Sequence, residues 1–304
     1  MAAVMSRRGW LLFAAMSVLW GIPYLMIKVA VAGVSVPVLV FARTAVGAAV
    51  LLPLVLGRGQ FAVLRGHWRP LLAFAAVEII VPWWLLSDAE RHISSSMAGL
   101  LVAASPVIAV VLARLLGDAD RLSGARWAGL GLGLAGVIVL AAPELSGGSV
   151  RGVLEMLVVA FCYAAGPLLA ARRLADVPAL PMTAVCLGLA ALVYAPPAIL
   201  TWPAELPSAR VIAALAGLAV LCTAVAFVAF FALIREVGTA RALVFTYVNP
   251  AVAVTAGVIL LSEPLTTPIL AAFALILVGS VLATGRGARR RAPEPEPRPV
   301  AATV

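Results

Sequence analysis

The chain has 304 residues, of which 64% are hydrophobic and 12% are charged, with a net charge of +9 and a mean hydropathy of +1.12. This composition excludes an ordinary soluble domain and is typical of an integral membrane protein. Solid apolar runs favour helices over the short alternating strands of a barrel. We therefore expect an all-α membrane protein.

The apolar runs are each long enough for a helix to cross about 30 Å of hydrocarbon at about 1.5 Å per residue. We predict ten spans, near residues 10–31, 36–56, 68–88, 93–115, 124–142, 151–171, 180–201, 208–234, 239–261 and 266–285. The first run follows Arg7 and Arg8 like a secretory or twin-arginine signal. It continues without a small-residue cleavage site, so we expect a retained first helix.

The basic excess is distributed unevenly between the two predicted sides of the membrane. With a cytoplasmic N-terminus, the cytoplasmic loops and ends hold Arg7, Arg8, Arg58, Arg65, Arg69, Arg114, Arg121, Arg126, Arg172, Arg173, Arg235, Arg241, Arg286, Arg289, Arg290, Arg291 and Arg298. The opposite side holds Arg91, Arg151 and Arg210. This asymmetry predicts that both termini are cytoplasmic and that nucleic acid is not a partner. Residues 286–304 read as a disordered cytoplasmic tail.

Residues for catalysis or metal binding do not form a pattern. Cys162, Cys186 and Cys222 lie in apolar spans without paired spacing or a nearby histidine, so we expect no disulfide or metal site. The GLGLGLAG segment lacks a P-loop lysine and reads as close helix packing through Gly129 and Gly133. We find no nucleotide-binding cassette and no nucleophile–base pair, and therefore expect neither an enzyme nor a cofactor.

The fourth and ninth spans end in related sequences, ASPVIAVVLARLLGDADRLS and VNPAVAVTAGVILLSEPLT. At offsets of 143 to 144 residues the matched pairs are Pro106 and Pro250, Asp120 and Glu263, Leu122 and Leu265, Ser123 and Thr266, Arg91 and Arg235, Trp20 and Tyr163, and Gly21 and Ala164. Residues 1–150 and 151–285 thus form two repeats of five spans each. Because five is odd, the repeats have inverted topology, the geometry that alternating access requires.

Several of these motifs occur together in one known family. They are Trp20, Gly21 and Lys28 in the first span, Pro37 and Arg43 in the second, and Pro250 with the EPLT sequence Glu263–Thr266 in the ninth. Over roughly residues 10–285 the chain resembles the EamA family of the drug/metabolite transporter superfamily. The resemblance implies an inner-membrane secondary carrier that exports amino acids or other small metabolites. The chain departs from the family pattern at Asp120, where glutamate is usual.

Other functions remain open alternatives. Within transport, the chain would also suit a drug or lipid-linked substrate exporter. From another class, it would suit a non-transporting membrane sensor or an intramembrane enzyme, although clustered catalytic groups and a signalling domain are missing from the sequence. The expected partners are a small-molecule substrate and the lipid bilayer, with proton coupling and a homodimer as further hypotheses.

Among the charged residues within the predicted spans, the candidates for a role in transport are Lys28, Arg43, Glu78 and Glu155. A charge near the centre of a membrane helix costs at least about 2.5 kcal/mol unless it faces a cavity or snorkels to the surface. Lys28 is about 5 Å deep, Arg43 about 10 Å and Glu78 about 15 Å. Glu155 is close to its helix start, which favours a helix-terminal charge.

Lys28 is the only lysine of the chain. It either snorkels or ends a lining face formed with Trp20 and Tyr24, which follow at helical spacing. Pro23 interrupts the same helix and frees backbone groups that tolerate exposure only in a cavity. The second repeat has Tyr163 in place of Trp20 and Ala171 in place of Lys28, so we expect the first repeat to be richer in polar lining. The shallow depth of Lys28 favours an entrance or gate.

Deeper in the membrane, Arg43 either pairs with Glu78 or binds a substrate carboxylate. Glu78 is a candidate to change protonation during transport, because burial disfavours a charged carboxylate. Trp83 and Trp84 either form part of the outer aromatic belt, or one of them lies against an apolar or aromatic ligand.

The prolines and nearby polar residues suggest moving or lining elements. Pro23, Pro82, Pro106 and Pro250 are candidate hinges. For Tyr247 and Asn249 we favour a lining role over helix–helix hydrogen bonding. We expect Ser94–Ser96 to cap the fourth span, and Glu263 and Asp120 to brace loops.

Overall fold

A computed structural model describes residues 5–55, 61–117, 123–147 and 149–284. Within these ranges, nine helical stretches are long and apolar enough to cross a membrane, and a shorter apolar helix, Asn249–Leu261, lies in the tenth predicted span. Every regular element in the described ranges is helical. The predicted all-α fold is therefore confirmed. The predicted tail, 286–304, lies outside the described residues.

Five spans come from each repeat, and several consist of more than one helical segment. The first repeat contains α1 (Arg7–Leu19), α2 (Pro23–Ala30), α3 (Val36–Val55), α4 (Phe61–Gly66), α5 (Trp68–Ala75), the π-helix η1 (Ala76–Ile80), α6 (Val81–Ala89), α7 (Ser95–Val102), α8 (Ser105–Leu115) and α9 (Gly124–Gly147). The second contains α10 (Val150–Arg173), α11 (Ala179–Leu200), α12 (Ala209–Ala216), the π-helix η2 (Gly217–Val225), α13 (Ala226–Val237), α14 (Thr239–Ala242), the 3-10 helix η3 (Leu243–Tyr247), α15 (Asn249–Leu261) and α16 (Thr267–Thr284). Both third spans thus contain a π-helix at the equivalent place.

All four candidate hinge prolines lie where a new helical segment begins. Pro23 starts α2, and Pro82, Pro106 and Pro250 occupy the first turns of α6, α8 and α15. Proline fits a first turn because its missing N–H has no partner to lose there. The prolines therefore account for the positions of the breaks, and a hinge motion at them stays a prediction.

Side chains from the second repeat satisfy carbonyl groups at breaks in the first. Tyr194 Oη donates to Ile80 O at 2.6 Å, beside the π-helix η1. Ser280 Oγ donates to Ala103 O at 3.0 Å, between α7 and α8. Non-helical backbone inside a membrane needs such partners, because lipid offers none.

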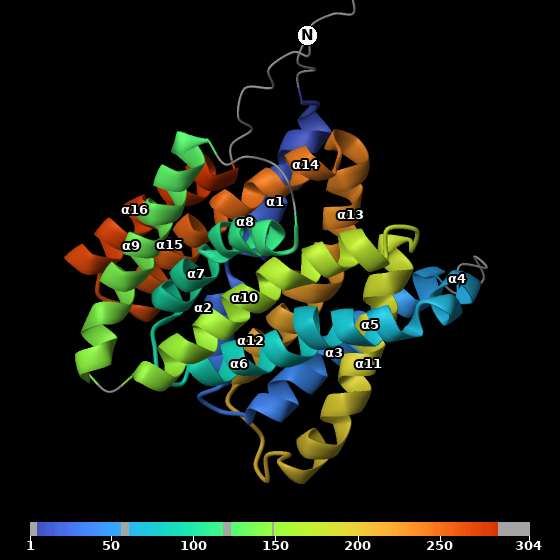
Figure 1. Cartoon of the computed structure of the whole chain (residues 1–304). Helices are drawn as coiled ribbons and strands as arrows, with labels where there is room; N and C mark the ends of the chain where they lie inside the picture. The colour runs from blue at the N-terminus through green and yellow to red at the C-terminus, as the bar shows by residue number, and fades with distance from the viewer. Residues whose placement is uncertain (1–4, 56–60, 118–122, 148, 285–304) are drawn as a thin grey trace, which may run out of the picture.

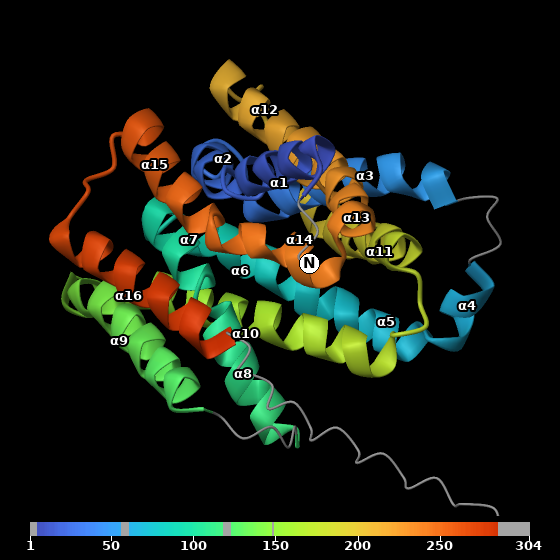
Figure 2. The same cartoon turned by 90° about the horizontal axis from the view of Figure 1, so that it is seen from above.

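Corresponding helices of the two repeats make the most extensive contacts, α9 with α16 and α3 with α11. The α9–α16 pair forms one edge of the bundle, and α3 and α11 lie toward another (Figures 1 and 2). A Cβ atom at Gly129 would collide with the backbone of Ala283, and one at Gly133 would lie 2.7 Å from Val107 Cγ2. The predicted close packing through these glycines is confirmed.

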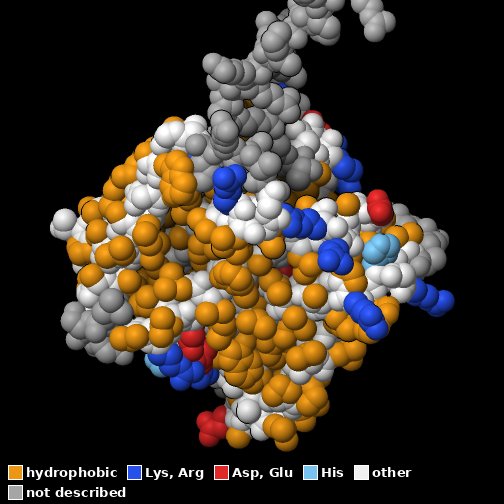
Figure 3. Space-filling view, viewed as in Figure 1, with side chains coloured by type: hydrophobic (Ala, Val, Ile, Leu, Met, Phe, Trp, Pro, Cys, Tyr) orange, Lys and Arg blue, Asp and Glu red, His pale blue; other side chains and the backbone are white. Residues whose placement is uncertain are grey.

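The surface is apolar over much of the face in Figure 3, and charged side chains gather toward two opposite edges. Large apolar side chains such as Leu192 and Ile259 are 72% and 71% exposed. Such a surface suits a lipid environment, with the charged edges in the interfacial regions.

Candidate functional site

Arg43 is the centre of a buried polar cluster between the repeats. Its side chain is only 7% exposed. Its Nε donates to Thr223 Oγ1 at 3.0 Å, and its guanidinium lies 3.7 Å from the centre of the Trp83 ring. Within the described part of the chain, no carboxylate lies at salt-bridge distance from Arg43. The expected ion pair with Glu78 is therefore wrong.

Two tyrosines complete this group, which we call the Arg43 cluster: Tyr24, Arg43, Trp83, Tyr163 and Thr223. Tyr24 and Tyr163 are close enough to Arg43 to interact with it electrostatically. The Tyr163 side chain also lies beside Trp83. The first repeat supplies three members through α2, α3 and α6, and the second repeat supplies two through α10 and η2. The cluster thus joins both repeats around one buried cation.

The position of Thr223 depends on its π-helix. Its hydroxyl donates to Leu218 O, five residues earlier, at 2.9 Å, so the oxygen can accept from Arg43. Gly47 on α3 lets this π-helix approach, since a Cβ there would lie 2.7 Å from Thr223 Cγ2. Sequence reasoning missed Thr223, because an isolated threonine in an apolar span gives no signal of a π-helix.

Glu78 faces a different neighbour from the one expected. It lies in η1, and its Oε2 is buried without a hydrogen-bond partner in the part of the chain that the structure describes. Its carboxylate packs against Gly166 of α10, where a Cβ atom would collide with it. Cys162 on the same helix is within electrostatic range. Glu78 therefore occupies the contact between η1 and α10.

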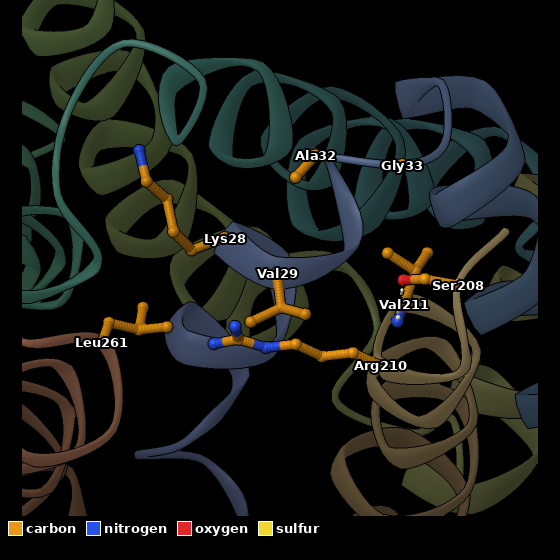
Figure 4. Close-up of a pocket in the computed structure, with 8 residues that line it drawn as sticks. All are labelled: Lys28, Val29, Ala32, Gly33, Ser208, Arg210, Val211 and Leu261. Atoms are coloured by element: carbon orange, nitrogen blue, oxygen red, sulfur yellow. Dashed lines mark hydrogen bonds between the residues drawn. The ribbon is translucent and has the colours of Figure 1, made fainter.

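The Lys28 ammonium binds backbone carbonyl groups at the end of the third span. Its Nζ donates to Glu90 O at 2.6 Å and to Ile93 O at 2.7 Å. Lys28 also borders an open groove of about 460 Å³ between α2, α12 and the end of α15. In Figure 4, Arg210 extends past Val29 toward Leu261, whereas Lys28 points away from Arg210. Lys28 is thus bound to the protein beside a groove, and we call this end of the bundle the Lys28 end.

Glu90 is a buried carboxylate that sequence reasoning missed. It is 0% exposed, and neither carboxylate oxygen has a hydrogen-bond partner among the described residues. It follows the last residue of the span 68–89. Burial raises the pKa of Glu90 well above its usual range, although the nearby Lys28 opposes this rise. In the segment SDAERH, Glu90 looks like an ordinary loop charge, which is why its burial was not expected.

Trp20 and Trp84 lie outside the Arg43 cluster. Because α1 ends at Leu19 and α2 begins at Pro23, the expected continuous face of Trp20, Tyr24 and Lys28 is interrupted. Trp20 packs against three phenylalanines: Phe227 at 5.6 Å, Phe230 at 5.0 Å and Phe245 at 5.5 Å between ring centres. Trp84 stacks on Tyr194, with ring centres 5.8 Å apart.

Tyr247 and Asn249 form hydrogen bonds between helices. The Tyr247 hydroxyl pairs with the Thr284 hydroxyl. In the orientation that satisfies its neighbours, the Asn249 amide donates to Phe245 O at 3.1 Å and to Ser17 O at 3.2 Å. Asn249 therefore links the break before α15 to the break after α1. The structure gives both residues the helix–helix role that we had ranked below lining.

Glu263 caps the N-terminus of α7. Its carboxylate accepts from Ser95 N at 2.8 Å, Ser95 Oγ at 2.9 Å, Ser96 N at 3.0 Å and Ser96 Oγ at 2.5 Å. Burial opposes its charge, but these four bonds prevail and lower the pKa of Glu263. Ser94 is the N-cap, accepting from Met97 N at 3.2 Å. The predicted bracing role of Glu263 is confirmed, whereas Asp120 lies outside the described residues.

A second ionic group lies at the Lys28 end. Arg151 binds Asp88 and also Glu155, the latter at 2.8 Å, and Asp88 lies 3.8 Å from Arg91. Glu155 therefore has the local ionic role expected for a charge near a helix start. Among the described residues, no three histidine, cysteine or acidic side chains are placed to hold a metal ion.

Comparisons with known proteins agree with this architecture. The model of the EamA-like transporter family matches residues 7–142 and again residues 150–285. A solved crystal structure shares 24% sequence identity at a TM-score of 0.64, over 91% of this chain and 96% of that chain. That likeness concerns the fold. No curated protein matches the chain. The two family matches cover both repeats, and the chain belongs to the EamA-like transporter family.

Proposed function

We propose that the protein is a secondary transporter that exports amino acids or related small carboxylates across the inner membrane by alternating access. The observation that carries this proposal is Arg43, a buried cation between the repeats with no carboxylate partner among the described residues. A buried charge is expensive unless another charge or polar groups compensate it. A substrate carboxylate would supply that compensation.

The Arg43 cluster has the chemistry to bind such a group. Thr223 engages Nε, which leaves the terminal guanidinium nitrogens as donors for a two-pronged carboxylate contact. The Trp83 ring holds the guanidinium plane through a cation–π contact. The hydroxyl groups of Tyr24 and Tyr163 add donors and acceptors beside an aromatic wall. An amphipathic metabolite with a carboxylate suits this combination better than a purely apolar drug.

The repeats suit alternating access because both contribute to the cluster. Relative movement of the repeats would expose Arg43 to one side of the membrane and then to the other. The arginine distribution supports cytoplasmic termini, and the export direction rests on the family resemblance.

A comparison of metabolite release tests this function. Strains that overexpress the protein, its Arg43→Met variant or no extra protein would be loaded with dipeptides, and the released amino acids would be measured. The proposal predicts faster release only with the unchanged protein. Equal release from all three strains across amino acids and related carboxylates would contradict it.

Coupling to protons through Glu78 is a separate hypothesis. In vesicles, Glu78→Gln should remove the pH dependence of flux if the Glu78 carboxylate takes up and releases the coupling proton. Unchanged pH dependence in this variant would remove Glu78 from the mechanism while leaving the carrier assignment intact.

A further inference from the structure

Among the described residues, the Glu90 carboxylate has neither a hydrogen bond nor an ion pair that would stabilise a buried charge. Its side chain is 0% exposed, and neither of its carboxylate oxygens has a hydrogen-bond donor among the described residues. Glu263, the other carboxylate close to it, accepts four hydrogen bonds. Burying a charged carboxylate without hydrogen-bond donors costs much free energy. Burying the neutral carboxylic acid costs much less.

The second repeat indicates that the fold does not require a carboxylate at this position. The offset that pairs Arg91 with Arg235 also pairs Glu90 with Ile234, a partly buried apolar residue. Lys28, whose ammonium binds the Glu90 carbonyl, likewise corresponds to Ala171. Two ionisable residues thus stand together in the first repeat where the second repeat has apolar ones. A structural role alone does not account for this replacement.

Glu90 is within electrostatic range of Lys28, which borders the groove, and of Arg43 and Tyr24 in the Arg43 cluster. The ionisable groups that face Glu90 come from three other segments. Lys28 and Tyr24 belong to α2, Arg43 belongs to α3, and Glu263 belongs to the segment after α15. On its own segment, Asp88 is bound by Arg151 of α10 and Arg91, and Glu155 of α10 is bound by Arg151. Within the described ranges, the carboxylate therefore has Lys28 and Arg43 in electrostatic range and no direct ion pair.

We propose that Glu90 is a proton-binding site of the transport cycle, protonated while the Lys28 end is packed as in this structure and ionised when that end opens. This inference rests on the proposed transport function. The step is a simple exchange, in which hydronium or a water-borne proton adds to the Glu90 carboxylate and leaves the same oxygen in the reverse step. Lys28 borders the groove at that end, so separation of α2 from the Glu90 carbonyl would admit water to the carboxylate.

Infrared spectroscopy tests the protonation state without any substrate. Purified protein in lipid at neutral pH should show a protonated-carboxyl C=O band, part of which is lost in Glu90→Gln. Glu78→Gln is the matched control, because it removes another buried carboxyl group and should leave the Glu90 component in place. An identical band in the unchanged protein and in Glu90→Gln would overturn the proposal.

Flux in reconstituted vesicles tests the link to transport. A mixture of radiolabelled amino acids serves as the probe, and a pH-sensitive dye inside the vesicles reports proton movement. Glu90→Gln should retain amino-acid counterflow but lose amino-acid-driven proton movement. Proton movement that persists in this variant would overturn the inference, even if counterflow is normal.

Two further measurements separate the possible failures. Glu90→Leu, which copies the apolar character of Ile234, provides a second variant if Glu90→Gln does not fold. Absence of counterflow in the unchanged protein would count against the proposed function instead, and the infrared result would still decide whether Glu90 binds a proton.

Discussion

The two repeats share an architecture but differ in their first spans. In the first repeat the span breaks into α1 and α2 at Pro23, whereas α10 runs unbroken from Val150 to Arg173 in the second, despite Pro167 within it. The broken span carries Tyr24 and Lys28. Similar folds can therefore carry unequal chemistry, with the ionisable groups concentrated in one repeat.

Three hydrogen bonds from the second repeat to backbone carbonyls of the first show a further difference. Tyr194, Asn249 and Ser280 belong to the second repeat, and each donates to a carbonyl at a break in the first. Side chains of the second repeat thus stabilise the interrupted helices of the first.

Thr223 of the second repeat accepts a hydrogen bond from Arg43 of the first. Thr223→Val keeps the shape but removes the acceptor for Arg43 Nε, and hydrogen bonds to charged groups contribute about 1.5–3 kcal/mol. We expect amino-acid flux in vesicles to fall about 10- to 100-fold. Thr44→Val is the control, because Thr44 is equally buried but bonds only to carbonyls of its own helix, Val40 O and Phe41 O. Equal losses in both variants would argue against a specific role for Thr223.

Lys28 binds two carbonyl groups within the first repeat, and the equivalent residue of the second repeat, Ala171, has no group that could do so. Lys28→Met leaves the carbonyls of Glu90 and Ile93 without their donor, and we expect a loss of about 2–3 kcal/mol in stability. Thermal unfolding followed by tryptophan fluorescence would measure it. Arg210→Met, at an exposed residue of the same groove, should change stability by no more than about 0.5 kcal/mol. A stable Lys28→Met protein would show that the ammonium is not a structural cap.

The α9–α16 contact tests whether the repeats depend on close approach of corresponding helices. Gly129→Ala places a methyl group against the α16 backbone, so overpacking should destabilise the protein by about 1–3 kcal/mol. Gly131→Ala meets no atom within 4 Å and should be neutral or stabilising, because alanine favours helices. The two melting temperatures should therefore move in opposite directions or differ clearly.

Replacement of Glu263 should have the smallest effect on stability, and this effect should depend on pH. Because its pKa is lowered in the folded protein, its contribution is present above the usual carboxylate range of about 4 and is lost as the pH falls through the lowered pKa. Since the group is only partly buried, Glu263→Gln should cost only about 1 kcal/mol at neutral pH. The difference in melting temperature between the two proteins should shrink on acidification. A constant difference would mean that the charge on Glu263 does not matter.

Much of the fold could be predicted, because the length and hydropathy of each apolar run and the positions of the prolines determine where helices begin and end. The spans, the repeat, the glycine contact and the bracing role of Glu263 all follow from such patterns. The partners of buried side chains could not be predicted, since they depend on helix rotation. The π-helix η2 brings Thr223 to Arg43, and η1 brings Glu78 to Gly166. A one-residue change in helical winding redirects a side chain by about 100°.

Counterflow by purified protein in liposomes tests most directly whether the substrate binds at Arg43 between the repeats. Vesicles loaded with unlabelled amino acids would be mixed with the radiolabelled mixture, with no ATP present. We predict saturable counterflow by the unchanged protein, a loss of counterflow in Arg43→Met, and near-normal counterflow in Cys186→Ala at the corresponding position of the second repeat. Full counterflow by a folded Arg43→Met protein would contradict this account.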